Sequence, residues 1–327
     1  MTRSHATTPP PVGGLRLDRA LVGRFARDYG VLIIIAALLI GLSFASDSFL
    51  TPRNLLNIVN QSAPLAIIAC ALTLVIIGGG FDLSTGAIFG VASVSAGWIA
   101  INVDPVLAVF AGPLIGLALG LVNGAIITTF NVHSFLVTLA TSLVYRGIAI
   151  LITGGALIPV RIAEFSWLGR ERVGMVNVAV LVFLAVMALM MLLLNRTTFG
   201  RRVFAVGGNE EAAILSGIRT HLVKIATFAI SGAAAGLAGV ITVSRISMAA
   251  PQGGAGLELE AIAAVILGGT SIMGGAGAIW RSVSGVLLMA LIGNGFNILN
   301  VNPFFKDLTT GVIIVIAVAL AASGSRR

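Results

Sequence analysis

Long apolar runs separated by short polar connections dominate this chain of 327 residues. A helix needs about 20 apolar residues to cross a bilayer, so the chain has room for about ten spans. We expect them near residues 30–46, 60–79, 85–103, 105–129, 135–153, 176–195, 222–243, 260–273, 277–300 and 307–323. The pattern predicts an all-α integral membrane protein with a basic tail at 1–29, one transmembrane domain at 30–323, a long loop at 196–222 and a short tail at 324–327.

Composition excludes a water-soluble domain. Hydrophobic residues make up 57% of the chain and charged residues only 10%, whereas soluble domains carry about 25% charged residues. The lone cysteine, Cys70, lies in an apolar run and is expected to pack rather than react. The 40 glycines suit helices that approach closely in lipid. Spacings of four residues predict helix contacts at Gly112, Gly116, Gly120, Gly124, Gly232 and Gly236.

Basic residues predict the orientation, because Lys and Arg stay preferentially on the cytoplasmic side. An even number of spans with both termini inside places most of them in the cytoplasm: Arg3, Arg16, Arg19, Arg24, Arg27, Arg196, Arg201, Arg202, Arg219, Lys224, Arg281, Arg326 and Arg327. The outside set is smaller: Arg53, Arg161, Arg170, Arg172, Arg245 and Lys306. The net charge of +8 is therefore a topology signal.

Two glycine-containing stretches resemble each other. Residues 75–79 (VIIGG) recur as 265–269 (VILGG), and 86–88 (GAI) recur as 277–279 (GAI). Spans broken at glycine are common in transporters, where freed backbone groups line a cavity, and internal repeats are common too. A two-fold internal repeat and a chance echo in a glycine-rich chain are both compatible with this pattern.

Ionisable residues inside the bilayer are costly and therefore functional candidates. Asp82 follows three glycines and either caps the helix that starts after the break or contacts a solute. For Arg146 we favour a structural ion pair or a carbonyl contact. Glu258 and Glu260 are expected near the start of the eighth span, where a helix N-terminus favours acidic groups.

The loop at 196–222 contains a predicted short helix. Asn209 can cap it, Glu210 and Glu211 lie in its first turn, and Gly217 can end it. Ala212, Ala213 and Ile214 give it a mildly apolar face. Such a helix suits docking into a groove of another protein, although an ordinary surface helix explains it equally well.

Catalysis has little support in the sequence. His5, His133 and His221 are scattered, and the glycine-rich stretch 268–277 lacks the lysine of a nucleotide-binding loop. We expect no cofactor or metal on this chain, so energy for transport must come from an ion gradient or a partner.

The loop motif resembles the coupling segment of ABC importer permeases. Glu211, Ala212 and Ala213 followed by Gly217 carry that likeness, and the chain around them is similar to the ribose-type, simple-sugar branch. Residues 79–86 (GGFDLSTG) and the stretch from Glu258 through 268–271 to 274–277 match two further hallmarks. The likeness covers most of 55–320, and it departs from the family pattern at Trp280 and Arg281.

The resemblance implies a permease subunit that moves a sugar or sugar-like solute across the bacterial inner membrane. It implies a second permease subunit, an outer solute-binding protein, and an ATP-binding subunit that holds ATP and Mg²⁺. The expected coupling residues are Asn209, Glu210, Glu211, Ala212, Ala213 and Gly217. The expected translocation-path residues are Gly79, Gly80, Asp82, Ser84, Gly268, Gly269, Thr270 and Ser271.

Three alternatives remain at this stage. The nearest is a branched-chain amino-acid ABC permease. A gradient-driven secondary transporter would more naturally carry several buried acids than the single Asp82. A membrane-embedded enzyme lacks a recognisable nucleophile or metal cluster.

Overall fold

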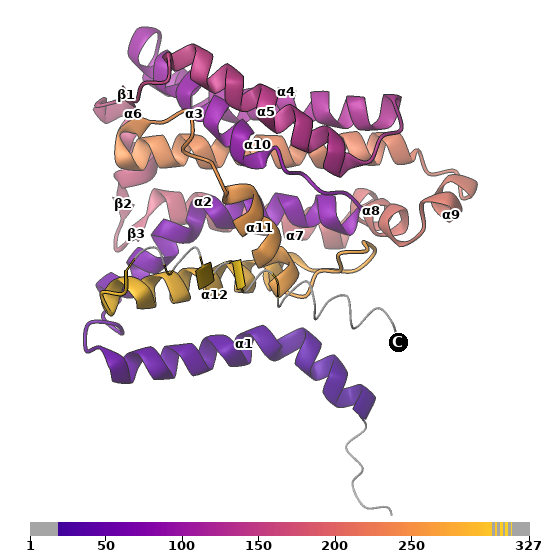
Figure 1. The fold of residues 1–327 in the computed structure, drawn as a ribbon, viewed down its shortest axis with the longest axis horizontal. Coiled ribbons are helices and arrows are strands. Elements are labelled where there is room, and N and C mark those ends of the chain that lie inside the picture. The colour runs from indigo at the N-terminus through magenta and orange to yellow at the C-terminus, as the bar shows by residue number, and fades with distance from the viewer. Residues whose placement is uncertain (1–18, 303–304, 306–307, 310, 313–314, 316–327) are drawn as a thin grey trace, which may run out of the picture.

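The computed structural model describes residues 19–302, 305, 308–309, 311–312 and 315, which form a bundle of helices (Figure 1). In chain order the helices are α1 Arg19–Ala45, α2 Pro52–Ile77, α3 Thr85–Asn102, α4 Pro105–Thr129, α5 Ser134–Thr153, α6 Ala163–Arg170, α7 Val178–Arg196, α8 Thr198–Gly208, α9 Glu210–Leu215, α10 Thr220–Ile246, α11 Leu257–Leu267 and α12 Ile279–Ile298. Two short antiparallel pairs join β1 Ile158–Pro159 to β4 Met248–Ala249, and β2 Arg172–Val173 to β3 Val176–Asn177. We call the end of the bundle with α8 and α9 the α9 end, and the opposite end the α6 end.

The chain is mostly helical, as predicted, and it has several helices suited to crossing a membrane. Among the described residues, seven helices are long and apolar enough to cross a membrane: α2, α3, α4, α5, α7, α10 and α12. Helix α1 adds a shorter apolar stretch, Tyr29–Ala45. It begins at Arg19, inside the segment expected as a tail. The expected span at 307–323 falls largely outside the described residues, so the count of about ten stays a prediction.

The expected eighth span is wrong in length. Instead of a helix over 260–273, α11 covers Leu257–Leu267, 11 residues. At 1.5 Å per residue it is about 16 Å long, roughly half of the hydrocarbon thickness. The reason is the segment before it, which lies against α3: the carbonyls of Pro251 and Gly254 occupy the space that side chains at Gly90 and Gly86 would fill. The chain re-enters the bundle in irregular form, and only part of its depth remains for α11.

The glycines spaced four residues apart on α4 and α10 form contacts between these two helices, as predicted. Gly112 and Gly116 on α4 meet Gly236 and Gly232 on α10 so closely that a side chain at any of these positions would overlap a carbonyl or side chain of the other helix. This contact brings α10 into the centre of the bundle beside α3 and α4 (Figure 1). Close backbone approach replaces the hydrophobic driving force that lipid does not supply.

Helix α2 occupies the core. Every residue from Ala66 to Ile77 is buried, including Cys70, which is free. Helices α4, α5 and α7 expose large apolar side chains, as expected of lipid-facing helices. Helix α1 lies at the edge of the bundle and packs on α12 (Figure 1).

Candidate functional site

Helix α9 has the ends that its sequence predicts. The Asn209 side-chain oxygen accepts from the Ala212 amide at 2.9 Å. Gly217, with a φ of 81°, ends the helix in the left-handed conformation, and the Ile218 amide donates to the Ala213 carbonyl at 3.0 Å. These bonds satisfy groups that a six-residue helix would otherwise leave open. The α9 backbone is therefore held in place despite its short length.

The outward face of α9 differs from the expected one. Ala213 is buried, whereas Ile214 is 54% and Leu215 89% exposed. Burial of Ala213 anchors the helix, so it cannot form part of a docking face. Leu215, which the sequence did not single out, is the most exposed large apolar side chain of α9.

The two acids of α9 do different things. The Lys224 ammonium on α10 lies 2.6 Å and 2.7 Å from the two Glu210 carboxylate oxygens. Glu211 is exposed on the outer side of the helix. Glu210 therefore fixes α9 to α10, which leaves Glu211 as the acid presented outward.

Three backbone segments meet where α8 ends. Gly207 packs against Gly79 and against the Ile77 carbonyl, which accepts from the Gly275 amide at 2.8 Å. A side chain at Gly207 would overlap that carbonyl, and one at Gly274 would come within 2.7 Å of the Gly207 carbonyl. We call residues 78–80, 207 and 274–275 the glycine junction. It places the loop that carries α9 in direct contact with both broken helices.

The two helix breaks share their local geometry. The amides of Gly79 and Gly80 donate to Ile76 and Val75, and the amides of Gly269 and Thr270 donate to the matching residues of α11. Gly79 and Gly269 both have positive φ, 82° and 87°. Residues 86–88 and 277–279 are alike in sequence but differ in structure, because Gly86 lies inside α3 whereas Gly277 lies before α12. The similarity of residues 75–79 to 265–269 therefore corresponds to a shared way of ending a helix, and the two-fold internal repeat stays a prediction.

Asp82 lies at the centre of a buried polar cluster. Its Oδ1 accepts from the Ser84 amide at 3.0 Å and the Ser84 hydroxyl at 2.6 Å, and its Oδ2 accepts from Ser231 on α10 at 2.8 Å. Asn123 on α4 donates to Ser84 at 2.7 Å, and Tyr145 on α5 donates to Asn123 at 3.0 Å. The cluster joins four elements in the interior of the bundle.

The helix-capping prediction for Asp82 needs correction. The N-cap of α3 is Ser84, and Asp82 lies two residues before it. Asp82 and Ser84 are both fully buried. The carboxylate accordingly fixes the extended segment before α3, because each of its oxygens has a hydroxyl partner.

The helix break at residues 268–271 also packs closely against neighbouring helices. The Thr270 hydroxyl lies 3.3 Å from that of Ser282, which accepts from Thr73 at 2.8 Å. A side chain at Gly268 would overlap the Arg281 carbonyl, and the Ser271 amide donates to Ala276 at 2.9 Å. The expected path residues in this segment therefore connect α2, α11 and α12.

Arg146 forms an ion pair, which is one of the two contacts expected for it. The Arg146 guanidinium on α5 lies 3.9 Å from the Glu258 carboxylate on α11. Glu258 and Glu260 lie in the first turn of α11, as predicted. The second Glu258 oxygen is buried beside Gly86 with no hydrogen-bond partner among the described residues.

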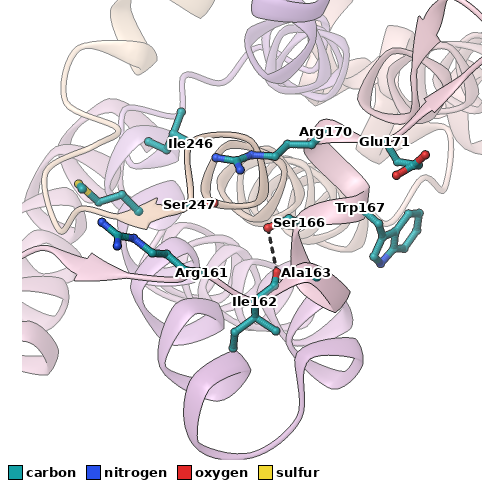
Figure 2. A pocket seen from close by; sticks show the side chains of 10 residues that line it. Arg161, Ile162, Ala163, Ser166, Trp167, Arg170, Glu171, Ile246 and Ser247 are labelled. Atoms are coloured by element: carbon teal, nitrogen blue, oxygen red, sulfur yellow. Dashed lines mark hydrogen bonds between the residues drawn. The ribbon is translucent and has the colours of Figure 1, made fainter.

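A cavity of about 610 Å³ opens at the α6 end (Figure 2). The side chains of Arg161 and Arg170 lie on different sides of it, and Trp167 and Glu171 lie at its edge (Figure 2). Ser166 donates to the Ile162 carbonyl at 2.8 Å, and Arg170 to the Arg245 carbonyl at 2.8 Å. It is a basic surface hollow formed by α6 with the residues that flank it, by the end of α10 and by Met248 of β4.

Comparison with known proteins decides the family. A family model described as the permease component of branched-chain amino acid transport systems matches residues 54–318. The chain belongs to this permease family. Named proteins that are similar to the chain include sugar permeases. The ribose import permease protein RbsC of Bacillus subtilis is 41% identical over 286 residues, which cover 86% of this chain and 89% of that protein.

Two relatives from Escherichia coli K12 extend the pattern. The D-allose transport system permease protein AlsC is 37% identical and the L-arabinose transport system permease protein AraH 35%, each over 90% of this chain and at least 90% of its own length. The resemblance to sugar-type ABC permeases is thereby confirmed. No solved structure matches this chain.

Sequence reasoning missed several residues of the site. Gly207 looks like an ordinary loop glycine, and Ser231 and Tyr145 look like isolated polar residues in apolar spans. Asn123, a polar residue beside the glycine stripe of α4, carried the clearest available signal. Nothing in the sequence pairs these residues with Asp82 or with the helix breaks.

Proposed function

We propose that the chain is the transmembrane permease subunit of an ATP-driven ABC importer that moves a sugar or sugar-like solute into the cytoplasm of a bacterium. The observation that carries this proposal is the identity of 35–41% to ribose, allose and arabinose permeases over most of each chain. The family model alone leaves a branched-chain amino acid open, and the named relatives favour the sugar.

The coupling residues of the proposal lie on and around α9. An ATP-binding subunit docks on the exposed face formed by Glu211, Ala212, Ile214 and Leu215, and the capping groups of Asn209 and Gly217 hold that face in shape. Glu210 keeps α9 attached to α10 through Lys224. ATP and Mg²⁺ belong to that partner, and this chain supplies the docking surface.

Movement of α9 is transmitted to the membrane-spanning helices through the glycine junction. Packed backbones transmit displacement because no flexible side chain lies between them. The breaks at Gly79–Gly80 and at Gly268–Ser271 move relative to α8, and the buried Asp82 cluster stabilises one of the two arrangements. The described conformation is then a closed one, in which Asp82, Ser84 and Thr270 are covered.

The proposal includes an orientation and two further partners. The α9 end and both termini face the cytoplasm, which agrees with the bias of Lys and Arg. The α6 end faces outward, and its arginine-lined hollow meets an outer solute-binding protein. A second permease subunit, identical or different, completes the transmembrane path.

Reconstitution tests the proposal. The permease, its ATP-binding subunit and its binding protein are placed in liposomes, and uptake of radiolabelled D-ribose, D-allose, L-arabinose and L-leucine is measured with and without ATP. We expect ATP-dependent uptake of at least one sugar and none of leucine. Leucine uptake alone would support the branched-chain alternative. Uptake that survives without ATP and collapses with the ion gradient would support a secondary transporter.

A further inference from the structure

A second cavity, of about 320 Å³, lies between α2, α10, α11 and α12. It extends from the last turns of α10 and α12, at the α6 end, toward the middle of α2. Its wall carries amide, carboxylate and guanidinium groups from Gln61, Arg245, Glu260, Asn294 and Asn297. This is an unusual concentration of hydrogen-bonding side chains for helices in a bilayer.

Two of these amides are exposed on spanning helices. Gln61 on α2 and Asn297 on α12 are both exposed, and Gln61 donates to Asn57 one turn away at 3.1 Å. Lipid contact would leave amide groups without hydrogen-bond partners, which costs free energy. A water-filled cavity satisfies them, so the exposure of Gln61 and Asn297 favours an aqueous space.

The walls of the cavity are tied together. The Arg245 guanidinium donates to the Asn60 carbonyl at 2.9 Å, which joins α10 to α2. Asn54 and Asn294 exchange reciprocal amide hydrogen bonds at 3.1 Å and 2.9 Å, which joins α2 to α12. A fixed wall keeps the remaining donors and acceptors at defined positions, as a selective site requires.

The cavity also has an apolar patch, formed by Phe89 and Met289. Phe89 packs on Gly253 and Gly254 in the irregular segment 250–256 that precedes α11, and it lies on α3 five residues after Ser84 of the Asp82 cluster. Amides that donate and accept, beside an apolar patch, match a small ring with several hydroxyl groups. Through Phe89 the cavity reaches α3, the helix that follows the first break.

We infer that this cavity is a contact site for an uncharged, polyhydroxylated solute on its way from the α6 end into the membrane. The inference rests on the proposed function and adds the residues that touch the solute. Gln61 and Asn297 bind hydroxyl groups, and Phe89 covers an apolar face of the ring. Arg245 and Asn294 hold the wall.

The test uses Gln61→Leu and Asn297→Leu, because both side chains are exposed and leucine is well tolerated in a membrane helix. The complete transporter in liposomes is supplied with D-ribose, D-allose and L-arabinose. Each variant should lower uptake of the transported sugar about three- to tenfold, which is the effect of losing one hydrogen bond, while the complex still assembles. Asn102→Leu is the matched control, since Asn102 is an exposed amide at the end of α3 that bonds only within its own helix to the Trp98 carbonyl among the described contacts.

A second measurement does not depend on transport rates. Cys70 is buried, so Asn297→Cys introduces a reactive thiol against a low background. It should react with an impermeant maleimide from outside, and the transported sugar at saturating concentration should slow that reaction at least twofold.

The outcomes separate the two proposals. A wild-type complex that imports no sugar contradicts the proposed function. A wild-type complex that imports sugar, with both leucine variants importing at the wild-type rate, contradicts the cavity assignment alone. Formation of a disulfide-linked dimer by Asn297→Cys, with labelling unchanged by sugar, would assign this face to contact between two copies and overturn the inference.

Discussion

One methyl group added at Gly207 would overlap the backbone of two other segments of the chain. Its neighbours are the Ile77 carbonyl and the Gly275 amide, which cannot rotate away as a side chain would. Gly208, the next residue of α8, has open space where its side chain would lie. The pair therefore separates packing at the glycine junction from the general effect of replacing glycine.

We predict that Gly207→Ala destabilises the permease by about 1–3 kcal/mol, the usual cost of overpacking. It should also uncouple ATP hydrolysis from uptake, because the junction must open to admit the methyl group. Gly208→Ala should be neutral or slightly stabilising, since alanine favours helix more than glycine. Thermal unfolding in detergent and uptake in liposomes measure both. Equal behaviour of the two variants would remove the junction from the coupling route.

Asp82 permits a second test at the scale of one residue. Asp82→Asn keeps an acceptor for the Ser84 amide and hydroxyl, whereas Asp82→Ala leaves the buried Ser84 amide without its partner, at about 1–3 kcal/mol. We expect the alanine variant to lose more membrane abundance and thermal stability than the asparagine variant. Equal and complete loss of transport in both, at normal abundance, would instead show that the negative charge itself acts on the solute.

At the scale of an element, α9 combines a fixed inner side with a free outer side. Glu211→Lys reverses the charge of an exposed first-turn residue and opposes the helix dipole. We predict normal insertion but loss of co-purification with the ATP-binding subunit, or ATP hydrolysis that no longer drives uptake. Arg219→Ala, also exposed and just beyond α9, is the control and should behave like wild type. Wild-type transport by Glu211→Lys with the ATP-binding subunit still bound would exclude α9 as the docking element.

Gly217→Val should weaken docking by a different route. The space around Gly217 is open, so the cost comes from its φ of 81°, a conformation that a β-branched residue tolerates poorly. The end of α9 would rearrange while the spans stay intact. Limited proteolysis at this loop should then increase in the variant.

The whole molecule makes a prediction about sidedness. The basic residues are concentrated at the α9 end, which the proposed orientation places in the cytoplasm. With Cys70 buried, Arg201→Cys should be shielded from an impermeant maleimide in intact cells and should react after permeabilisation. Arg172→Cys, exposed at the α6 end, should react in intact cells. Labelling of Arg201→Cys from outside would reverse the orientation.

Local sequence determined the features that depend on near neighbours. Apolar runs located α2 through α5, and Asn209 and Gly217 located the ends of α9, because both kinds of signal act within one or two helical turns. The glycines of α4 and α10 predicted a close contact, since four-residue spacing places them on one helix face. The assignment to sugar transport came from the resemblance of motifs in the chain to those of sugar-type ABC permeases.

Tertiary structure decided the features that join distant residues. Pairing of Glu210 with Lys224, of Arg146 with Glu258, and of Asp82 with Ser231 depends on how helices far apart in sequence pack, and no periodicity records it. Helix α11 is short because the segment before it lies on α3, a contact that its own apolar run does not reveal. Gly207 matters because three backbones meet around it, and only the folded bundle brings those backbones together.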